Sequence, residues 1–590
     1  MYNQKYAIYQ VFTRLFGNKN TQHVPWGTIE QNGVGKFSDF TDKALSEIRK
    51  LGMTHIWYTG VPHHAIINDY KHIGISDDHP SVVKGRAGSP YAVKDYYSVN
   101  PDLAENPDRR LEEFEALIKR SHDNGLKVII DIVPNHVARH YKGLNNPEGV
   151  SDFGAQDDTT VEYHRDNNFY YIPNSTFELP DMEPAFTPLG GEQHPSLSSP
   201  FIETPAKWTG NGSRLDKPNF DDWYETVKIN YGVRPNGSKD FPELPKDYAQ
   251  RDYRKHHQFW ESVAVPSSWI KFRDIALFWL DKGVDGFRYD MAEMVPVEFW
   301  SYLNSSIKMK NQDAFLMAEV YQPDLYRDYI HLGKMDYLYD KVDLYDGLKA
   351  IMQGKASTAI IPEIQHQMMD IEHHMMHFLD NHDEQRISSP EFVGNPHVAK
   401  PAMLVSALLS SSPTMIYFGQ EVGEPGAENA GFGQPSRTSI FDYIGVPQHQ
   451  KWMNNGAFDG ELLNNNEKQL RHFYQKVMNF SLEHSSMTGD YQDLHQCSNL
   501  SDSVYAFLRY DHQELTIVAA NFSQHTTESI HLEISHDVIQ KLKLVDGRYI
   551  LNEHIEGIAQ QVLDIENSVG SFNIELKPLA SLAWVLSLNR

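Results

Sequence analysis

Three acidic residues close short apolar segments in the second half of the chain. Asp290 ends the segment GFRYD, Glu319 ends FLMAE and Asp383 ends FLDNHD. A buried carboxylate costs several kcal/mol unless it is paired or takes part in chemistry. Paired carboxyls cleave glycosidic bonds, because one attacks the sugar while the other carries the proton. The three acids, with Arg288 and His382 beside them, therefore predict a glycosidase site.

The segments around these acids alternate between helix and strand patterns. A helix is predicted at residues 40–51, which Gly52 closes, and a strand at 54–58. Residues 127–133 form a continuous apolar run, as in a strand buried on both faces. The alternation resumes with a helix at 269–281 and strands at 283–288, 314–320, 335–339, 376–379 and 414–418. About eight such pairs predict an α/β fold, the (β/α)8 TIM barrel, whose catalytic groups lie where strands end.

Two parts of the chain lack this alternation. Residues 137–232 follow the third strand and are rich in Asn, Asp, Gly, Pro and Tyr, which predicts an inserted, loop-rich B domain. From about residue 486, strand patterns follow one another without helices between them, which predicts an all-β sandwich. We therefore expect a barrel at 1–136 and 233–485, the inserted domain at 137–232 and a C-terminal domain at 486–590.

Composition excludes several classes of partner and site. The 590-residue chain has a formal net charge of −26, which repels phosphate backbones, so we expect no nucleic-acid partner. Its single cysteine, Cys497, excludes an intrachain disulfide and a cysteine-based zinc site. No segment approaches the roughly 20 apolar residues that span a bilayer. The N-terminal residues lack a signal-peptide pattern, which predicts the cytoplasm, whereas a trimmed signal peptide would indicate secretion or the periplasm.

The segments around the acids resemble the signature regions of the α-amylase superfamily, glycoside hydrolase family 13. Four main regions are matched by residues 131–136 (DIVPNH), 286–292 (GFRYDMA), 318–320 (AEV) and 378–383 (FLDNHD). The regions at strands two and eight resemble residues 52–57 (GMTHIW) and 413–421 (PTMIYFGQE). Each match alone is weak, but all of them occur in the family's order and at predicted strand ends. Together they form a specific signal.

The resemblance implies roles for the residues at the strand ends. Asp290 is the expected nucleophile and Glu319 the general acid/base. Asp383 is expected to bind hydroxyls of the distorted sugar and Asp131 to brace the floor of the site. Arg288 is expected to keep Asp290 ionised, because a nearby cation lowers a carboxyl pKa. In a retaining enzyme the two reacting carboxyls lie roughly 5–5.5 Å apart.

The resemblance also implies substrate contacts at four positions: Tyr91, Asp95, His136 and His382. Tyr91, in the segment GSPYAVKDY, resembles the family's stacking tyrosine, and sugar rings have apolar faces that pack on aromatic rings. Asp95 is the usual neighbour of that tyrosine. The two histidines are expected to hydrogen-bond sugar hydroxyls.

Two features depart from the family pattern. Classical α-amylases carry lysine and histidine three and four residues after the nucleophile, where this chain has Glu293 and Met294. The usual pair contacts the sugar on the side of the leaving group. Its absence leaves undetermined which leaving group or acceptor the site takes.

The metal site is the second departure. Asn135 matches a calcium ligand, and the partner segment is either 179–183 (LPDME), which supplies Asp181, or 226–231 (TVKINY), where Lys228 replaces the acid. Calcium prefers several oxygen ligands. The sequence leaves open whether structural calcium or the Lys228 ammonium occupies this junction.

We expect retaining hydrolysis of α-1,4-glucosidic bonds in maltodextrin or starch-type α-glucans by double displacement, with no cofactor required for the chemistry. One alternative is a glucanotransferase, maltosyltransferase or α-glucosidase of the same family. Another is a catalytically silent carbohydrate-binding protein, because fold alone never proves activity. The sequence does not determine the oligomeric state.

Overall fold

The computed structural model describes residues 5–183, 186–433, 435–495, 498 and 500–588, so Cys497 lies outside the described residues. Its centre is a closed barrel in which all strand pairs are parallel. The barrel strands, in order around the barrel, are β1 (Ala7–Phe12), β2 (His55–Thr59), β5 (Lys127–Ile132), β10 (Gly286–Tyr289), β11 (Phe315–Ala318), β12 (Tyr337–Tyr339), β13 (Met375–Phe378) and β14 (Thr414–Tyr417). The predicted TIM barrel is confirmed.

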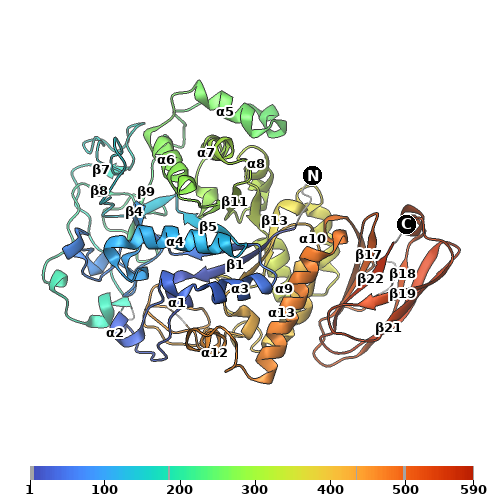
Figure 1. The fold of residues 1–590 in the computed structure, drawn as a ribbon. Coiled ribbons are helices and arrows are strands. Elements are labelled where there is room, and N and C mark those ends of the chain that lie inside the picture. Colours follow the sequence, from blue (N-terminus) through green and yellow to red (C-terminus); the bar gives the residue numbers. More distant parts are fainter. Residues whose placement is uncertain (1–4, 184–185, 434, 496–497, 499, 589–590) are drawn as a thin grey trace.

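Helices connect successive barrel strands and cover the barrel (Figure 1). On α4 the buried side chains include Phe114, Leu117 and Ile118, at the helical spacing that the sequence shows. The covering helices are α3 (Asp42–Lys50), α4 (Arg110–Asp123), α6 (Ser267–Asp281), α7 (Val297–Lys310), α8 (Tyr326–His331), α9 (Asp346–Met352), α10 (Ile360–Met368), α11 (Lys400–Leu408) and α13 (Asn465–Glu483). Shorter or peripheral helices are α1 (Thr13–Phe16), α2 (Ile29–Asn32), α5 (Tyr253–Glu261) and α12 (Pro447–Met453).

Two insertions rise from the ends of barrel strands. The predicted one follows β5, the third barrel strand, and contains the short pairs β6 (His136–Ala138) with β9 (Thr226–Lys228) and β7 (Tyr171–Ile172) with β8 (Ala206–Lys207). The other insertion was not predicted from the sequence. It follows β2 and pairs β3 (Pro62–His64) with β4 (Val93–Val99) in antiparallel fashion. Its strands are short and fully buried, so they lack the polar–apolar alternation that reveals a hairpin.

The C-terminal part is an antiparallel sheet beside α11 and α13 (Figure 1). Its order is β15 (Asp490–Asp493), β16 (Val504–Tyr510), β17 (Glu514–Asn521), β22 (Ser581–Ser587), β19 (Gly547–Glu553), β20 (Gln561–Glu566), β21 (Val569–Leu576) and β18 (Glu528–Ile534), with α14 (His536–Leu542) after β18. The ring of Phe572 on β21 packs edge-on against Trp584 on β22, with centroids 5.6 Å apart. The two halves of the sheet therefore share one core, as the predicted sandwich requires.

The predicted strands occur with small shifts at their ends. Residues 335–339, for example, contain only β12, because the strand begins at Tyr337. The proposed domain boundaries at residues 136, 232 and 485 stay predictions. Among the described residues, no helix is long and apolar enough to cross a bilayer.

Candidate active site

Arg288 joins carboxyl groups from three neighbouring barrel strands. It is fully buried on β10, where its Nη1 donates to Asp290 Oδ1 at 2.8 Å and its Nη2 donates to Glu319 Oε2 at 2.7 Å. Nη1 also lies 3.4 Å from Oδ1 of Asp131 on β5, and Trp57 Nε1 donates to the other oxygen of Asp131 at 2.9 Å. One guanidinium therefore holds the predicted nucleophile, the predicted acid and the predicted brace together. The separation of the two reacting carboxyls stays a prediction.

The barrel backbone sets the positions of both acids. Asp290 follows β10 and donates its N–H to Ile132 O at 3.0 Å, while Glu319 follows β11 and donates to Tyr289 O at 3.0 Å. Met291, the residue after Asp290, has a φ of 44°, in the left-handed region that residues other than glycine rarely adopt. This turn directs the Met291 N–H to Glu319 Oε2 at 2.9 Å. The strand ends thus place two carboxyls on adjacent strands without a long flexible loop.

Burial and charge act in opposite directions on Asp290. Burial raises its pKa well above the ordinary value; Arg288 opposes this shift, and Glu319 and Asp383 add to it. The sequence predicts that Arg288 keeps Asp290 ionised. The guanidinium does act in that direction, but burial outweighs it. The pKa of Asp290 is therefore raised by burial even though a cation lies beside it.

Asp383 is held by a short chain of side chains across the mouth. Gln10 Nε2 lies 2.8 Å from His382 Nδ1, so this nitrogen accepts and the proton of the neutral ring belongs on Nε2. His382 Nε2 lies 3.1 Å from Asp383 Oδ2 and also contacts the Tyr91 hydroxyl. Burial keeps the pKa of His382 well below its ordinary value, with Arg288 adding to the effect. His382 is therefore a neutral donor that orients Asp383 and Tyr91.

The other residues that were predicted to contact sugar differ in their position and burial. Tyr91 is partly exposed and its ring stacks on His382 at 5.3 Å, so it stands at the site. His136 lies at the start of β6, and burial, followed by the nearby Lys228, lowers its pKa to about 3.

Asp95 differs from these residues, because it is fully buried and accepts from the backbone N–H groups of Tyr97 and Leu144 at 2.9 and 3.1 Å. It braces β4 against the inserted segment. Substrate binding by Asp95 stays a prediction that this geometry does not favour.

Replacing Asp383 with asparagine should stabilise the protein at alkaline pH. Burial, with Glu319 next, raises the pKa of Asp383 from 3.8 to about 7, although 39% of its side-chain surface is accessible. The stability that comes from its proton is fully present below pH 3.8 and is lost as the pH rises through about 7. Asparagine stays neutral, so Asp383→Asn should have a higher Tm than wild type at pH 8 and a similar Tm at pH 4.

Solvent screening limits this gain to about 1 kcal/mol or less. Calorimetric Tm values at both pH values test it, with Asp281→Asn as a matched surface control, since the Asp281 side chain is 62% exposed. A gain in Tm that is equal at the two pH values would contradict the proton-linked explanation.

Comparison with known proteins identifies the family of this chain. The model of the family "Alpha amylase, catalytic domain" matches residues 10–182 and 248–471, more than half of the chain. This chain belongs to that family. Alpha-amylase 3 of Dictyoglomus thermophilum is 21% identical over 92% of this chain and 91% of its own, and a cyclomaltodextrinase of a Bacillus species is 20% identical over 87% and 72%. A maltogenic alpha-amylase from Thermotoga neapolitana has a similar fold, with a TM-score of 0.59 at 16% identity over 98% of this chain and 99% of its own.

The α-amylase resemblance implies calcium near Asn135, and the residues present do not fit it. The Lys228 ammonium contacts Asn135 Oδ1, and Asn135 Nδ2 donates to Gly210 O at 2.8 Å. Asp181, the competing candidate ligand, has a side chain that is 95% exposed and pairs with Lys217 at 2.7 Å. The segment with Lys228 is therefore the one that meets Asn135. Within the described ranges, no group of three or more acidic, histidine or cysteine side chains could hold a metal.

Two residues that shape this α-amylase-family site were not predicted from the sequence. Gln10 orients His382, and the Tyr339 hydroxyl accepts from Arg288 Nε at 3.2 Å. Gln10 is a polar residue inside the apolar strand β1, which is a signal that could have singled it out. Tyr339 ends β12, but a buried tyrosine in a strand also fits ordinary core packing, so its sequence carries no comparable signal.

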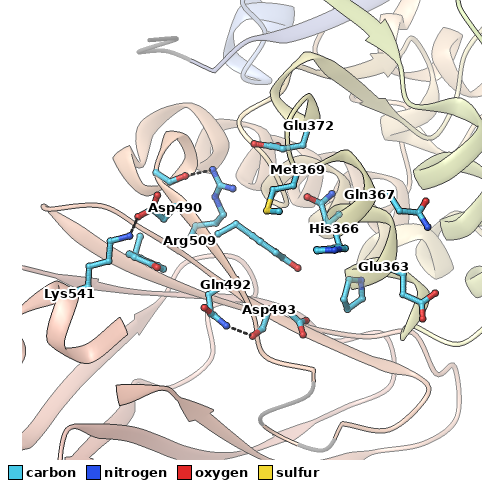
Figure 2. A pocket seen from close by; sticks show the side chains of 15 residues that line it. Glu363, His366, Gln367, Met369, Glu372, Asp490, Gln492, Asp493, Arg509 and Lys541 are labelled. Carbon is cyan, nitrogen blue, oxygen red and sulfur yellow. Dashed lines mark hydrogen bonds and ion pairs between the residues drawn. The ribbon is translucent and has the colours of Figure 1, made fainter. Parts of the chain in front are cut away.

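Cavity size alone would not have located the site. A cavity of about 910 Å³ lies where α10 faces β15 and β16 of the C-terminal sheet, and none of the predicted catalytic residues lines it (Figure 2). Two of its charged groups are engaged with the protein: Lys541 pairs with Asp490, and the Arg509 guanidinium donates to backbone carbonyls of Leu409, Met487 and Gly489. The barrel mouth is distinguished by its chemistry.

Proposed function

We propose that this protein hydrolyses α-1,4-glucosidic bonds in maltodextrin-type α-glucans with retention of anomeric configuration. One observation carries the proposal: Arg288 holds Asp290 and Glu319 together at the ends of the adjacent strands β10 and β11. Double displacement needs two carboxyls close together, one as nucleophile and one as acid/base. The relatives named alpha-amylase and cyclomaltodextrinase support a glucan or maltodextrin as the substrate.

The first step transfers the sugar to the enzyme. The Asp290 carboxylate, which accepts from Arg288 Nη1, attacks the anomeric carbon while protonated Glu319 gives its proton to the departing glycosidic oxygen, so the C–O bond breaks as the ester forms. The Arg288 guanidinium stabilises the carboxylate that Glu319 becomes, since its Nη2 donates to Glu319 Oε2. Tyr91 packs on the sugar face, and Asp383, oriented by His382, accepts from sugar hydroxyls.

The second step releases the sugar. Glu319 accepts a proton from water, the resulting hydroxide oxygen attacks the anomeric carbon, and the ester bond to Asp290 breaks. Two inversions at one carbon give net retention, and Glu319 regains its proton for the next cycle. All of these groups come from the protein itself, and no step is assigned to a metal.

Incubation with maltohexaose should give shorter maltooligosaccharides whose new reducing ends first appear as the α-anomer. Chromatography of a time course measures product length, and NMR within the first minutes measures the anomer. Longer oligosaccharides before short ones would favour transfer, and a β-anomer would exclude double displacement.

Transfer of the glycosyl group to a sugar acceptor is the second candidate function, and Glu293 is the observation that supports it. This residue replaces the usual lysine, and its Oε2 accepts from the N–H groups of Tyr321 and Gln322 at 2.8 and 3.1 Å. Glu293 thereby anchors the loop just after Glu319, on the side where a leaving group or acceptor enters. Maltotetraose distinguishes the candidates, because a transferase makes longer products before glucose accumulates.

A further inference from the structure

We propose that the Lys228 ammonium is a built-in cation that replaces a metal ion at the junction between the inserted segment and the barrel, and that it positions the turn after Asp290. Lys228 ends β9, opposite His136 on β6. From there its Nζ reaches Asn135, which follows β5, and the carbonyl oxygen of Met294 at 3.3 Å. One side chain therefore links three segments that are far apart in the sequence.

The oxygen atoms around Lys228 are arranged for a cation. The Asn135 amide cannot turn away, because its Nδ2 donates to Gly210 O and lies 3.0 Å from His136 Nδ1, which leaves Oδ1 for the ammonium. The Asn135 backbone carbonyl is also used, accepting from Ile229 N at 3.0 Å. Asn135 is fully buried, so an Oδ1 without a donor there would be costly.

The number and charge of these oxygens suit an ammonium and not calcium. Calcium takes six to eight oxygens, usually including carboxylates. Lys228 meets two neutral oxygens, and among the described residues no carboxylate lies within ion-pair distance of it. Burial lowers the pKa of Lys228 to about 7, and the two oxygens that it meets favour the protonated form, which has three N–H donors. Two are satisfied by these oxygens, and the third can face the adjoining cavity of about 410 Å³, which Lys228, Glu293 and Met294 help to line.

The contact with Met294 connects this cation to the chemistry. Met294 ends the short helical turn Ala292–Met294, which begins two residues after Asp290. The same turn is tied to the acid, since Ala292 N donates to Glu319 O at 3.0 Å. Lys228 is therefore a positioning residue: it fixes the far end of the turn whose near end carries the nucleophile.

Three variants test the proposal: Lys228→Met removes the ammonium, Lys228→Asp supplies a carboxylate, and Lys217→Asp is a control for the same charge change on the exposed face of the inserted segment. Each protein is measured in excess EDTA and in excess calcium chloride, for Tm and for kcat and KM with maltohexaose. Wild type and Lys217→Asp should show the same Tm and kcat in both solutions. Lys228→Met should lose about tenfold or more in kcat, with KM changed less than about threefold, and should melt lower in both solutions.

Lys228→Asp should melt lower than wild type in EDTA and recover part of this loss in calcium, because the new carboxylate joins the oxygens of Asn135 and Met294. A wild-type Tm that falls in EDTA and returns with calcium would overturn the proposal, as would wild-type kcat and Tm in Lys228→Met. The kcat comparison rests on the proposed function, whereas the Tm comparison does not. A failure of the proposed function can therefore be distinguished from a failure of the proposal on Lys228.

Discussion

Asp290→Asn should lower kcat/KM for maltohexaose by about 10³–10⁵, because it removes the atom that attacks the anomeric carbon. This loss corresponds to about 4–7 kcal/mol of transition-state stabilisation. Folding should survive the change. Burial raises the pKa of Asp290, so a neutral amide of the same shape suits the site at least as well as the carboxylate. Initial rates over a range of maltohexaose concentrations, with Tm measured in parallel, test both parts.

Asp281→Asn is the matched control for Asp290→Asn, since Asp281 ends α6 on the surface and pairs with Lys310. It should keep the wild-type rate. If Asp290→Asn also turned over maltohexaose at a rate close to wild type, the assignment of the nucleophile would be wrong. A lost rate together with a collapsed Tm would instead require a milder change before the role could be judged.

Glu319→Gln should lower kcat for maltohexaose by about 10²–10⁴, because the glycosidic oxygen then leaves without a proton. An aryl maltoside with an acidic phenol as leaving group needs little protonation, so its first step should slow by less than about tenfold. The second step lacks its base in this variant, and the ester on Asp290 should accumulate. Stopped-flow absorbance should therefore show a burst of phenol release followed by slow turnover.

The contrast between the two substrates identifies the acid. Glu363→Gln, on the exposed face of α10, is the control and should behave as wild type with both substrates. Equal losses of Glu319→Gln on maltohexaose and on the aryl maltoside, without a burst, would assign Glu319 to binding and not to proton transfer. Such a result would leave the nucleophile assignment intact, because the two tests address different steps.

The residues at strand ends were predictable because barrel geometry constrains them. Parallel strands that close into a barrel direct all their C-terminal ends to one edge. Asp290, Glu319 and Asp383 could therefore be expected to meet once their apolar segments were recognised as strands. Six short motifs in a fixed order strengthened that expectation, and the closed barrel confirms the fold behind it.

Residues outside the barrel strands were less predictable. The segment GSPYAVKDY indicates a tyrosine and a nearby acid, but it does not show that Asp95 will find the N–H groups of Tyr97 and Leu144. Leu144 lies in the insertion after β5, and no periodic pattern there reports how the loop folds back. Such contacts depend on loop conformation, which local sequence specifies weakly.

The sequence by itself predicted the parallel barrel and the all-β C-terminal part, because apolar periodicity is a local property, and it singled out three acids and Arg288 at strand ends, to which the family resemblance gave roles. Only the tertiary structure decided which carboxyls share the guanidinium, that Gln10 orients His382, and that Lys228 rather than Asp181 meets Asn135. These are contacts between segments tens to hundreds of residues apart. Their formation depends on how the insertions pack over the barrel mouth, and burial among those segments then raises the pKa of Asp290 and of Asp383.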